Sequence, residues 1–412
     1  MQIQDIPVII IGAGPAGSAA SVFLSKAGIR HLLLDKQTFP RDKVCGDGCS
    51  GKTAQVLLKA NPDWLQEIVQ DSGNNLLSRG IKFYAPNGKP ISIPFNGSNE
   101  KITGFTSRRI DFDHFLFQKT KSEYAEVFTG ISGLTVERSL GFVVHFKHLN
   151  QSLQYKTSLL IAADGDKSQV RKNIHLAEDK AKSYAVGVRN YYKGVQGMDE
   201  NNFIELHFIK GLLPGYFWIF PMANNLSNVG LVMLSEDIRN NRINLRDKMQ
   251  EIIDLHPTIK NRFLKAEVAG KNAGWGLPMR MSPSAISGEG YLLAGDAAHL
   301  VDPFSGEGIG NALYSGMLAA HAAEKAIEQN NYTAAFFREN YDAVVWRYFG
   351  AEFKISATLQ KLTKQPWLFN WVVNKAGKSK SLQQTLSGMF NDMQVRDQLR
   401  KPSFYFKVLF NR

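Results

Sequence analysis

The stretch VIIIGAGPAGSAASVFLSKAGIRHLLLDK, residues 8–36, decides the fold. Its first four residues are a continuous apolar run, as in a strand that is buried on both faces. Residues 16–27 predict a helix that ends at Gly28, and residues 32–34 predict a second buried strand. The stretch therefore predicts a strand, a helix and a parallel strand, which is the repeating unit of an α/β fold.

The turn between the first strand and the helix carries the glycines of a dinucleotide site. Gly12 permits a tight turn, Gly14 lets a pyrophosphate approach the backbone, and Gly17 lets the helix pack closely on the strand. Asp35 ends the second strand, eighteen residues after Gly17, where its carboxylate can hold the adenosine ribose hydroxyls. A lone GxGxxG is weak evidence, but this placement predicts a bound dinucleotide. The alternative is the same strand–helix–strand unit without a bound dinucleotide.

Composition narrows the class of protein. The chain has 412 residues, enough for roughly two or three domains with a well-buried core, so its stability requires neither disulfides nor a structural metal. Its two cysteines are only four positions apart, and its start, MQIQDIPVIII, lacks the features of a signal peptide. No apolar run approaches the roughly 18 residues of a membrane-spanning helix. We therefore expect a cytoplasmic protein.

Beyond residue 80 the pattern changes to hairpins. Residues 81–95 predict two short strands around the turn Asn87-Gly88, and residues 202–234 predict three more strands with polar turns between them. Residues 159–172, which contain another buried strand ending in an acid, lie between these two regions. We therefore expect segments of a nucleotide-binding domain to alternate along the chain with segments of an antiparallel sheet.

A second motif selects FAD among the dinucleotides. Residues 294–310, AGDAAHLVDPFSGEGIG, place Asp296 at the end of a buried strand, where its carboxylate could bind ribityl hydroxyls. Gly306, Gly308 and Gly310 follow at a helix start, whose free N–H groups and dipole favour the negative charge of reduced flavin. Only one GxGxxG follows a strand, which disfavours tandem domains for FAD and a nicotinamide nucleotide.

These motifs carry a family resemblance. The segments GAGPAG, ADGDKSQVR and GDAAHLVDPFSGEGIG resemble the FAD-dependent superfamily with the p-hydroxybenzoate hydroxylase fold. Within it, FPRDKVCGDG and GYFWIFP are similar to the geranylgeranyl reductase family, whose members reduce isoprenoid double bonds. The resemblance covers nearly all of residues 1–330, and it implies FAD contacts at Gly12, Gly14, Ala16, Gly17, Asp35, Arg109, Asp164, Gly295, Asp296, Gly308, Ile309 and Gly310.

The pair Arg108-Arg109 offers two candidates for one of these contacts, and the spacing to Phe112 and Asp113 favours Arg109. The expected fold is α/β: a Rossmann-type FAD-binding domain interleaved with an antiparallel β-sheet substrate domain, followed by a helical C-terminal region. The expected boundaries are 1–79, 101–180 and 268–330 for FAD binding, 80–100 and 181–267 for the substrate sheet, and 331–412 for the helices.

The segment PRDKVCGDGCSGKT, residues 40–53, holds both cysteines. The resemblance implies that Cys45, Gly46, Asp47 and Gly48 pass beside the isoalloxazine, with Cys45 a catalytic candidate and the other three beside the substrate. A disulfide between Cys45 and Cys49 is an alternative, and so is a role for both thiols as small buried apolar groups. A metal site is disfavoured, because no cluster of histidines or acids supplies further ligands.

The strand expected at residues 216–221, YFWIFP, would place Tyr216, Trp218 and Phe220 on one face. This face either belongs to an ordinary core or roofs an apolar substrate cavity, and the resemblance favours the cavity, with Tyr216 and Trp218 as catalytic candidates and Phe220 contacting substrate. The sequence departs from the family pattern at Val232, where a second glycine is usual. His299 also departs, because GDAAH is more typical of the hydroxylases.

The resemblance implies a flavin-dependent reductase of carbon–carbon double bonds in a prenyl or similar apolar chain. NAD(P)H or another donor would reduce the flavin, and Cys45, Tyr216 or a trapped water would supply the proton. An aromatic or polyketide hydroxylase on the same fold is the alternative, which His299 supports. A halogenase is disfavoured because the motif WxWxIP is missing and Trp218 stands alone.

The C-terminal region is aromatic and basic. The whole chain has a formal net charge of +12, and residues 331–412 hold 13 Lys and Arg against 5 Asp and Glu. Its aromatic residues at helical spacing either pack on the body of the protein or, with the lysines, dock on an anionic membrane. No motif supports nucleic-acid binding. We expect a monomer that is cytoplasmic and peripheral at the inner membrane face.

Overall fold

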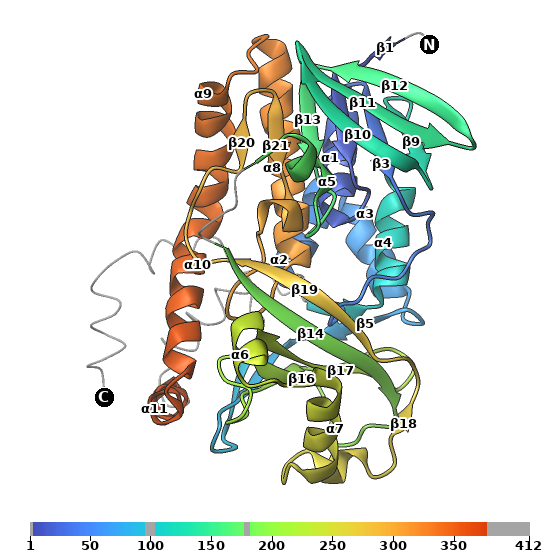
Figure 1. Cartoon of the computed structure of the whole chain (residues 1–412). Helices are drawn as coiled ribbons and strands as arrows, with labels where there is room; N and C mark the ends of the chain where they lie inside the picture. Colours follow the sequence, from blue (N-terminus) through green and yellow to red (C-terminus); the bar gives the residue numbers. More distant parts are fainter. Residues whose placement is uncertain (1–2, 95–103, 177–181, 377–412) are drawn as a thin grey trace.

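The computed structural model describes residues 3–94, 104–176 and 182–376, and it confirms the predicted α/β fold (Figure 1). Its nucleotide-binding half is built on a six-stranded sheet in the order β20-β21-β13-β2-β3-β9. All pairs in this sheet are parallel except the edge pair β20–β21. The strands are β2 (Val8–Ile11), β3 (His31–Asp35), β9 (Ala125–Thr129), β13 (Leu159–Ala162), β20 (Ser287–Gly288) and β21 (Tyr291–Leu293).

Two long helices cover this sheet. The helix α1 (Pro15–Lys26) follows β2, as the sequence predicts, and packs along α8 (Ile309–Glu328). The two approach closely because α8 has a glycine at the contact: a Cβ on Gly316 would lie 2.0 Å from Ala16 O. The remaining helices of this half are α2 (Gly51–Ala60), α3 (Pro62–Gln70), α4 (Arg109–Gln118) and α5 (Gln169–Asn173).

Two small sheets complete the nucleotide-binding half. A four-stranded sheet contributes its buried side chains to the same apolar core as β2, β3 and β13. A three-stranded sheet, β4-β8-β5, holds the second cysteine of the chain. Their strands are β1 (Gln4–Asp5), β10 (Ser132–Ser139), β11 (Gly141–His148) and β12 (Gln151–Thr157), and β4 (Gly48–Cys49), β5 (Asn75–Ser78) and β8 (Gly104–Ser107).

The second half is an eight-stranded, mostly antiparallel sheet in the order β18-β14-β17-β16-β15-β6-β7, with β19 also paired to β14. One face packs against α7 (Leu245–Leu255), near the short α6 (Ser235–Asn240). The last long strand extends this sheet beyond the expected boundary at residue 267. The strands are β6 (Gly80–Tyr84), β7 (Pro90–Pro94), β14 (Lys182–Lys193), β15 (Ile204–His207), β16 (Tyr216–Pro221), β17 (Leu226–Leu234), β18 (Glu267–Val268) and β19 (Ala273–Arg280).

The C-terminal helices join the two halves. A short α9 (Ala334–Phe337) leads through one π-helical turn (Arg338–Asp342) into α10 (Ala343–Thr363), which runs along the molecule to α11 (Pro366–Ala376) (Figure 1). Near its start α10 packs into the core of the nucleotide-binding half, and α11 packs on the sheet half. None of the helices within the three described ranges is both long enough and apolar enough to cross a membrane.

The aromatic residues of these helices divide into two groups. Phe349, Phe353 and Phe369 are buried, which agrees with packing on the body of the protein. Trp367 and Trp371, one turn apart on α11, are 69% and 39% exposed. Lys378 and Lys380, which contribute to the expected basic surface, lie outside the described residues, as does the whole of 377–412.

Candidate active site

A cavity of about 990 Å³ lies between the two halves. It is lined by the turn after β2, the loop before β4, the ends of β13 and β21, the loop before α8, and the inner face of the large sheet. All but two of the residues proposed for the site contribute to its wall. Gly17 and Gly310 instead shape the turns behind it: a Cβ on Gly17 would lie 1.7 Å from Gly12 O.

The turn between β2 and α1 has the geometry of a dinucleotide cradle. Gly12 has φ +102°, and a Cβ there would lie 2.3 Å from Ala163 O on the neighbouring strand, so only glycine fits. The carboxylate of Asp35 accepts hydrogen bonds from Ala13 N (2.7 Å) and Gln37 N (2.7 Å). These bonds hold the acid at the carboxyl end of β3, beside the free N–H groups at the start of α1.

Asp164 closes the same end of the cavity. Its Oδ2 accepts from Gln169 N (2.6 Å) and Val170 N (3.1 Å), which caps the start of α5. Its Oδ1 is buried without a hydrogen-bond partner, and burial raises the pKa of the carboxyl group. A buried carboxylate oxygen that lacks a partner in the cavity wall is a ready acceptor for hydroxyl groups of a ligand.

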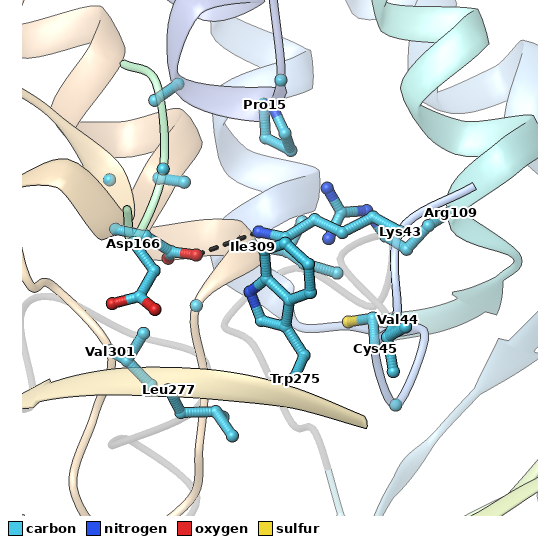
Figure 2. A pocket seen from close by; sticks show the side chains of 18 of the residues that line it. Pro15, Lys43, Val44, Cys45, Arg109, Asp166, Trp275, Leu277, Val301 and Ile309 are labelled. Carbon is cyan, nitrogen blue, oxygen red and sulfur yellow. Dashed lines mark hydrogen bonds and ion pairs between the residues drawn. The ribbon is translucent and has the colours of Figure 1, made fainter. Parts of the chain in front are cut away.

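Asp296 follows β21 in a short 3₁₀ helix, η2 (Gly295–Ala298), and its Oδ2 pairs with Lys43 Nζ at 2.9 Å. Figure 2 shows the Lys43 side chain extending across the cavity beside the indole of Trp275, whose ring centroid is 5.9 Å from Nζ. Lys43 was not singled out in the sequence, although it lies within the family-like segment FPRDKVCGDG. It places a cation in the cavity wall beside Asp296.

Buried charged side chains hold the start of α8 in place. Glu307 Oε1 accepts from Gly310 N at 2.7 Å, and Lys52 Nζ donates to Asn311 Oδ1 (3.0 Å) and Glu352 Oε1 (2.5 Å). Lys52 belongs to α2 and Glu352 to α10, so three helices meet at this point. The sequence pattern did not identify Lys52 or Glu352, because their partners are far apart along the chain.

The loop before β4 lies flat against an aromatic ring. A Cβ on Gly46 or Gly48 would approach the Phe220 ring to 3.0 or 3.1 Å, so glycine lets the loop and the ring make contact. Both cysteines are free thiols in the structure, and burial raises the pKa of each. The three described ranges contain no group of histidine, cysteine and acidic side chains arranged to hold a metal ion.

Arg109 lies beneath this loop. Its Nε and Nη2 donate to Asp113 at 2.6 and 2.7 Å, and its guanidinium also interacts with the Cys45 thiol. The neighbouring Arg108 instead pairs with Asp111 at the surface. The structure thus places Arg109, and not Arg108, in the cavity wall, and Asp113 holds its guanidinium in place.

The aromatic residues of β16 form the opposite wall. Tyr216, Trp218 and Phe220 all line the cavity, as the alternation of the strand predicts. The Tyr216 hydroxyl donates to Ser305 O at 2.6 Å. A Cβ on Gly230 would lie 2.3 Å from the Trp218 ring, so this glycine is required for the indole to lie on β17. With Val232, also in the wall, these groups make an apolar chamber.

A hydrogen-bonded chain ties the chamber to the cysteine loop. Trp218 Nε1 donates to Asn228 Oδ1 at 2.9 Å, and Asn228 Nδ2 donates to Cys45 O and to Asp47 Oδ2, both at 2.8 Å. Tyr191 OH donates to the same Asp47 oxygen at 2.5 Å. Neither Asn228 nor Tyr191 belongs to a motif, and the position of Asn228 two residues before Gly230 is the only sequence signal for it.

His299 has a conformational role in the turn after η2. It is 3% exposed, and its backbone is left-handed, with φ +58°. Its N–H donates to Asp296 O at 3.0 Å, and it does not line the cavity. This position gives no support to a catalytic histidine.

Comparisons with known proteins agree with this geometry. A family model described as an FAD binding domain matches residues 5–322. Over 330 residues the chain is 30% identical to the menaquinone reductase of Mycobacterium tuberculosis, a match that covers 78% of this chain and 77% of that protein. It is 29% identical to the digeranylgeranylglycerophospholipid reductase of Thermoplasma volcanium over 341 residues, with 80% and 81% covered.

Solved structures share the fold over almost the whole chain. A geranylgeranyl bacteriochlorophyll reductase-like protein of Thermoplasma acidophilum superposes with a TM-score of 0.79 at 23% identity, covering 97% of this chain and 99% of its own. A flavin-dependent brominase gives the same TM-score at 19% identity, covering 98% and 99%. At these identities the two structures support the fold alone.

Proposed function

Because this chain belongs to the geranylgeranyl reductase family of FAD-dependent oxidoreductases, we propose that it reduces carbon–carbon double bonds in an isoprenoid chain or a similar apolar substrate. FAD supplies the hydride when it is bound. The residues that would hold it are the glycine turn at Gly12 and Gly14, Asp35 at the ribose, and Asp296 with Lys43 nearer the ring. NAD(P)H or another donor serves as the reductant.

One observation carries the choice of substrate: the chamber on the sheet side of the cavity is apolar and aromatic. Tyr216, Trp218 and Phe220 line it from β16, Val232 lines it from β17, and Leu277 lines it from β19. Apolar groups of a substrate gain roughly 25 cal/mol for each Å² removed from water. A prenyl chain fits such a wall, whereas polar groups of a small aromatic acid that lay against these side chains would lose water without gaining a hydrogen bond.

An anaerobic experiment separates the reductase from the alternative hydroxylase on the same fold. We expect reduced enzyme, mixed without oxygen with a prenylated quinone or a geranylgeranyl lipid, to be reoxidised at a rate that depends on substrate concentration. Absorbance at the oxidised flavin band measures this reoxidation. Reduced enzyme that is inert to both substrates, yet forms a flavin hydroperoxide with oxygen, would support the hydroxylase instead.

The exposed side of α11 suggests how such a substrate arrives. Trp367 and Trp371 lie one turn apart and are exposed, and Lys375 Nζ lies 5.8 Å from the Trp371 ring centroid. Lys364, three residues before Trp367 in the chain, is also exposed. Aromatic and basic side chains together favour the interface of an anionic membrane. The protein, as a monomer without a nucleic-acid partner, docks there peripherally from the cytoplasmic side and takes its substrate from the bilayer.

A further inference from the structure

Reduction of an alkene requires a proton as well as a hydride, and few groups in the described cavity wall can supply one. Tyr216 already donates its hydroxyl hydrogen to Ser305 O, and burial raises its pKa. Burial raises the pKa of the Cys45 thiol, and it raises that of Cys49 well above its usual value. Glu307 accepts a backbone N–H at the start of α8. Asp47 differs from these four groups in geometry.

The carboxyl group of Asp47 has one oxygen in use and one without a partner. Its Oδ2 accepts from Tyr191 OH and Asn228 Nδ2, and its Oδ1 is buried with no hydrogen bond, although Asp47 is one of the residues that line the cavity. The side chain is 0% exposed. Buried polar atoms normally have partners, so the unpaired Oδ1 is the oxygen that stays available to carry the carboxyl proton toward a ligand in the cavity.

The groups around Asp47 set the pKa of its carboxyl group close to neutral pH. Burial raises its pKa to about 6, and hydrogen bonds from Tyr191 and Asn228, followed by the charges of Arg189 and Arg109, offset part of that rise. The groups facing Asp47 come from its own loop, from β4, α4, β14 and β17. They are Cys45, Cys49, Arg109, Arg189, Tyr191 and Asn228.

We propose that Asp47 is the proton donor of the reaction, that its free Oδ1 faces the substrate double bond, and that Tyr191 and Asn228 hold it in place. This inference rests on the proposed function. The O–H bond of Asp47 breaks, and the π electrons of the double bond form a C–H bond between this proton and one alkene carbon. The hydride supplied by the cofactor forms the C–H bond at the other carbon. Asp47 remains as a carboxylate that Tyr191 stabilises, and it regains a proton from solvent.

Two variants and a matched control test the assignment. Asp47→Asn keeps the shape but removes the acid, and we expect prenyl reduction by pre-reduced enzyme to fall by roughly 100-fold or more, with FAD still bound. Tyr191→Phe removes a hydrogen bond that favours the charged form of Asp47, so the pKa of Asp47 should rise. The rate, which falls when Asp47 loses its proton at high pH, should therefore begin to fall at a higher pH. Tyr192 is the adjacent residue and packs on the opposite face of β14, so Tyr192→Phe should leave the pH at which the rate falls unchanged.

Infrared titration of the carboxyl C=O band gives a readout that does not depend on turnover. Asp342, whose pKa is also raised to about 6, contributes to the spectra of all variants, so the difference between the native holoenzyme and Asp47→Asn isolates the Asp47 band. This band should titrate near pH 6, and it should shift upward in Tyr191→Phe. The assignment would be overturned if Asp47→Asn kept the native rate and its pH dependence, or if the rate of Tyr191→Phe fell at the same pH as that of the native enzyme. Failure of the native enzyme to reduce any prenyl substrate would instead overturn the proposed function, and this inference with it.

Discussion

At the scale of single residues, Asp296 has the most direct consequence for cofactor binding. Its carboxylate lies in the cavity wall at the end of β21, paired with Lys43. Each charge-assisted hydrogen bond to a ribityl hydroxyl contributes roughly 1.5–3 kcal/mol, so Asp296→Ala should weaken FAD binding by about 10-fold or more. Equilibrium titration of the apoprotein with FAD measures the effect. Asp111→Ala, which breaks a surface pair outside the cavity, is the control and should bind FAD normally. Equal affinity in both variants would contradict the assignment of Asp296.

At the scale of elements, the ion pair between Lys52 of α2 and Glu352 of α10 joins helices that are distant along the chain. Both side chains are almost completely buried, at 3% and 4% exposed. Removal of one partner leaves a buried charge, so Lys52→Met should lower the free energy of unfolding by about 3–5 kcal/mol. The double variant Lys52→Met/Glu352→Gln should recover much of that loss. The surface pair of Lys248 and Glu251, one turn apart on α7, is the control, and Lys248→Ala should change stability by less than about 1 kcal/mol. Denaturant titrations would measure each change, and a loss in Lys52→Met no larger than in Lys248→Ala would refute this role.

At the scale of the whole molecule, the net charge of +12 and the exposed face of α11 predict reversible docking on anionic membranes. Each basic residue near such a surface contributes about 1 kcal/mol, screened by salt. The protein should sediment with anionic vesicles at low salt, be released at high salt, and ignore neutral vesicles. Trp367→Ala/Trp371→Ala should weaken sedimentation, whereas Leu140→Ala/Leu149→Ala, two exposed apolar residues on turns of the four-stranded sheet, should not. If the native protein stays in the supernatant with anionic vesicles at low salt, the membrane proposal is wrong.

Much of the nucleotide-binding half is readable from local sequence. The apolar run of β2, the glycines of the turn and the helix α1 lie within twenty residues of one another, and each depends on steric or periodic rules that act over one or two turns of chain. The alternation of β16 likewise predicts which of its aromatic side chains share a face. These features require no knowledge of what packs against them.

The hydrogen-bond and ion-pair partners of Asp47 and Lys52 could be identified only from the tertiary structure. Asp47 meets Tyr191 across 144 residues of chain and Asn228 across 181, and Lys52 meets Glu352 across 300. A single tyrosine or asparagine in a strand has no periodic signal that reveals its partner. The raised pKa of Asp47 likewise comes first from burial between the loop and the large sheet, and burial depends on how the two halves come together. Local rules could therefore predict the cofactor turn, and the family resemblance singled out Asp47, whereas the partners that hold Asp47 depend on contacts between segments that are far apart along the chain.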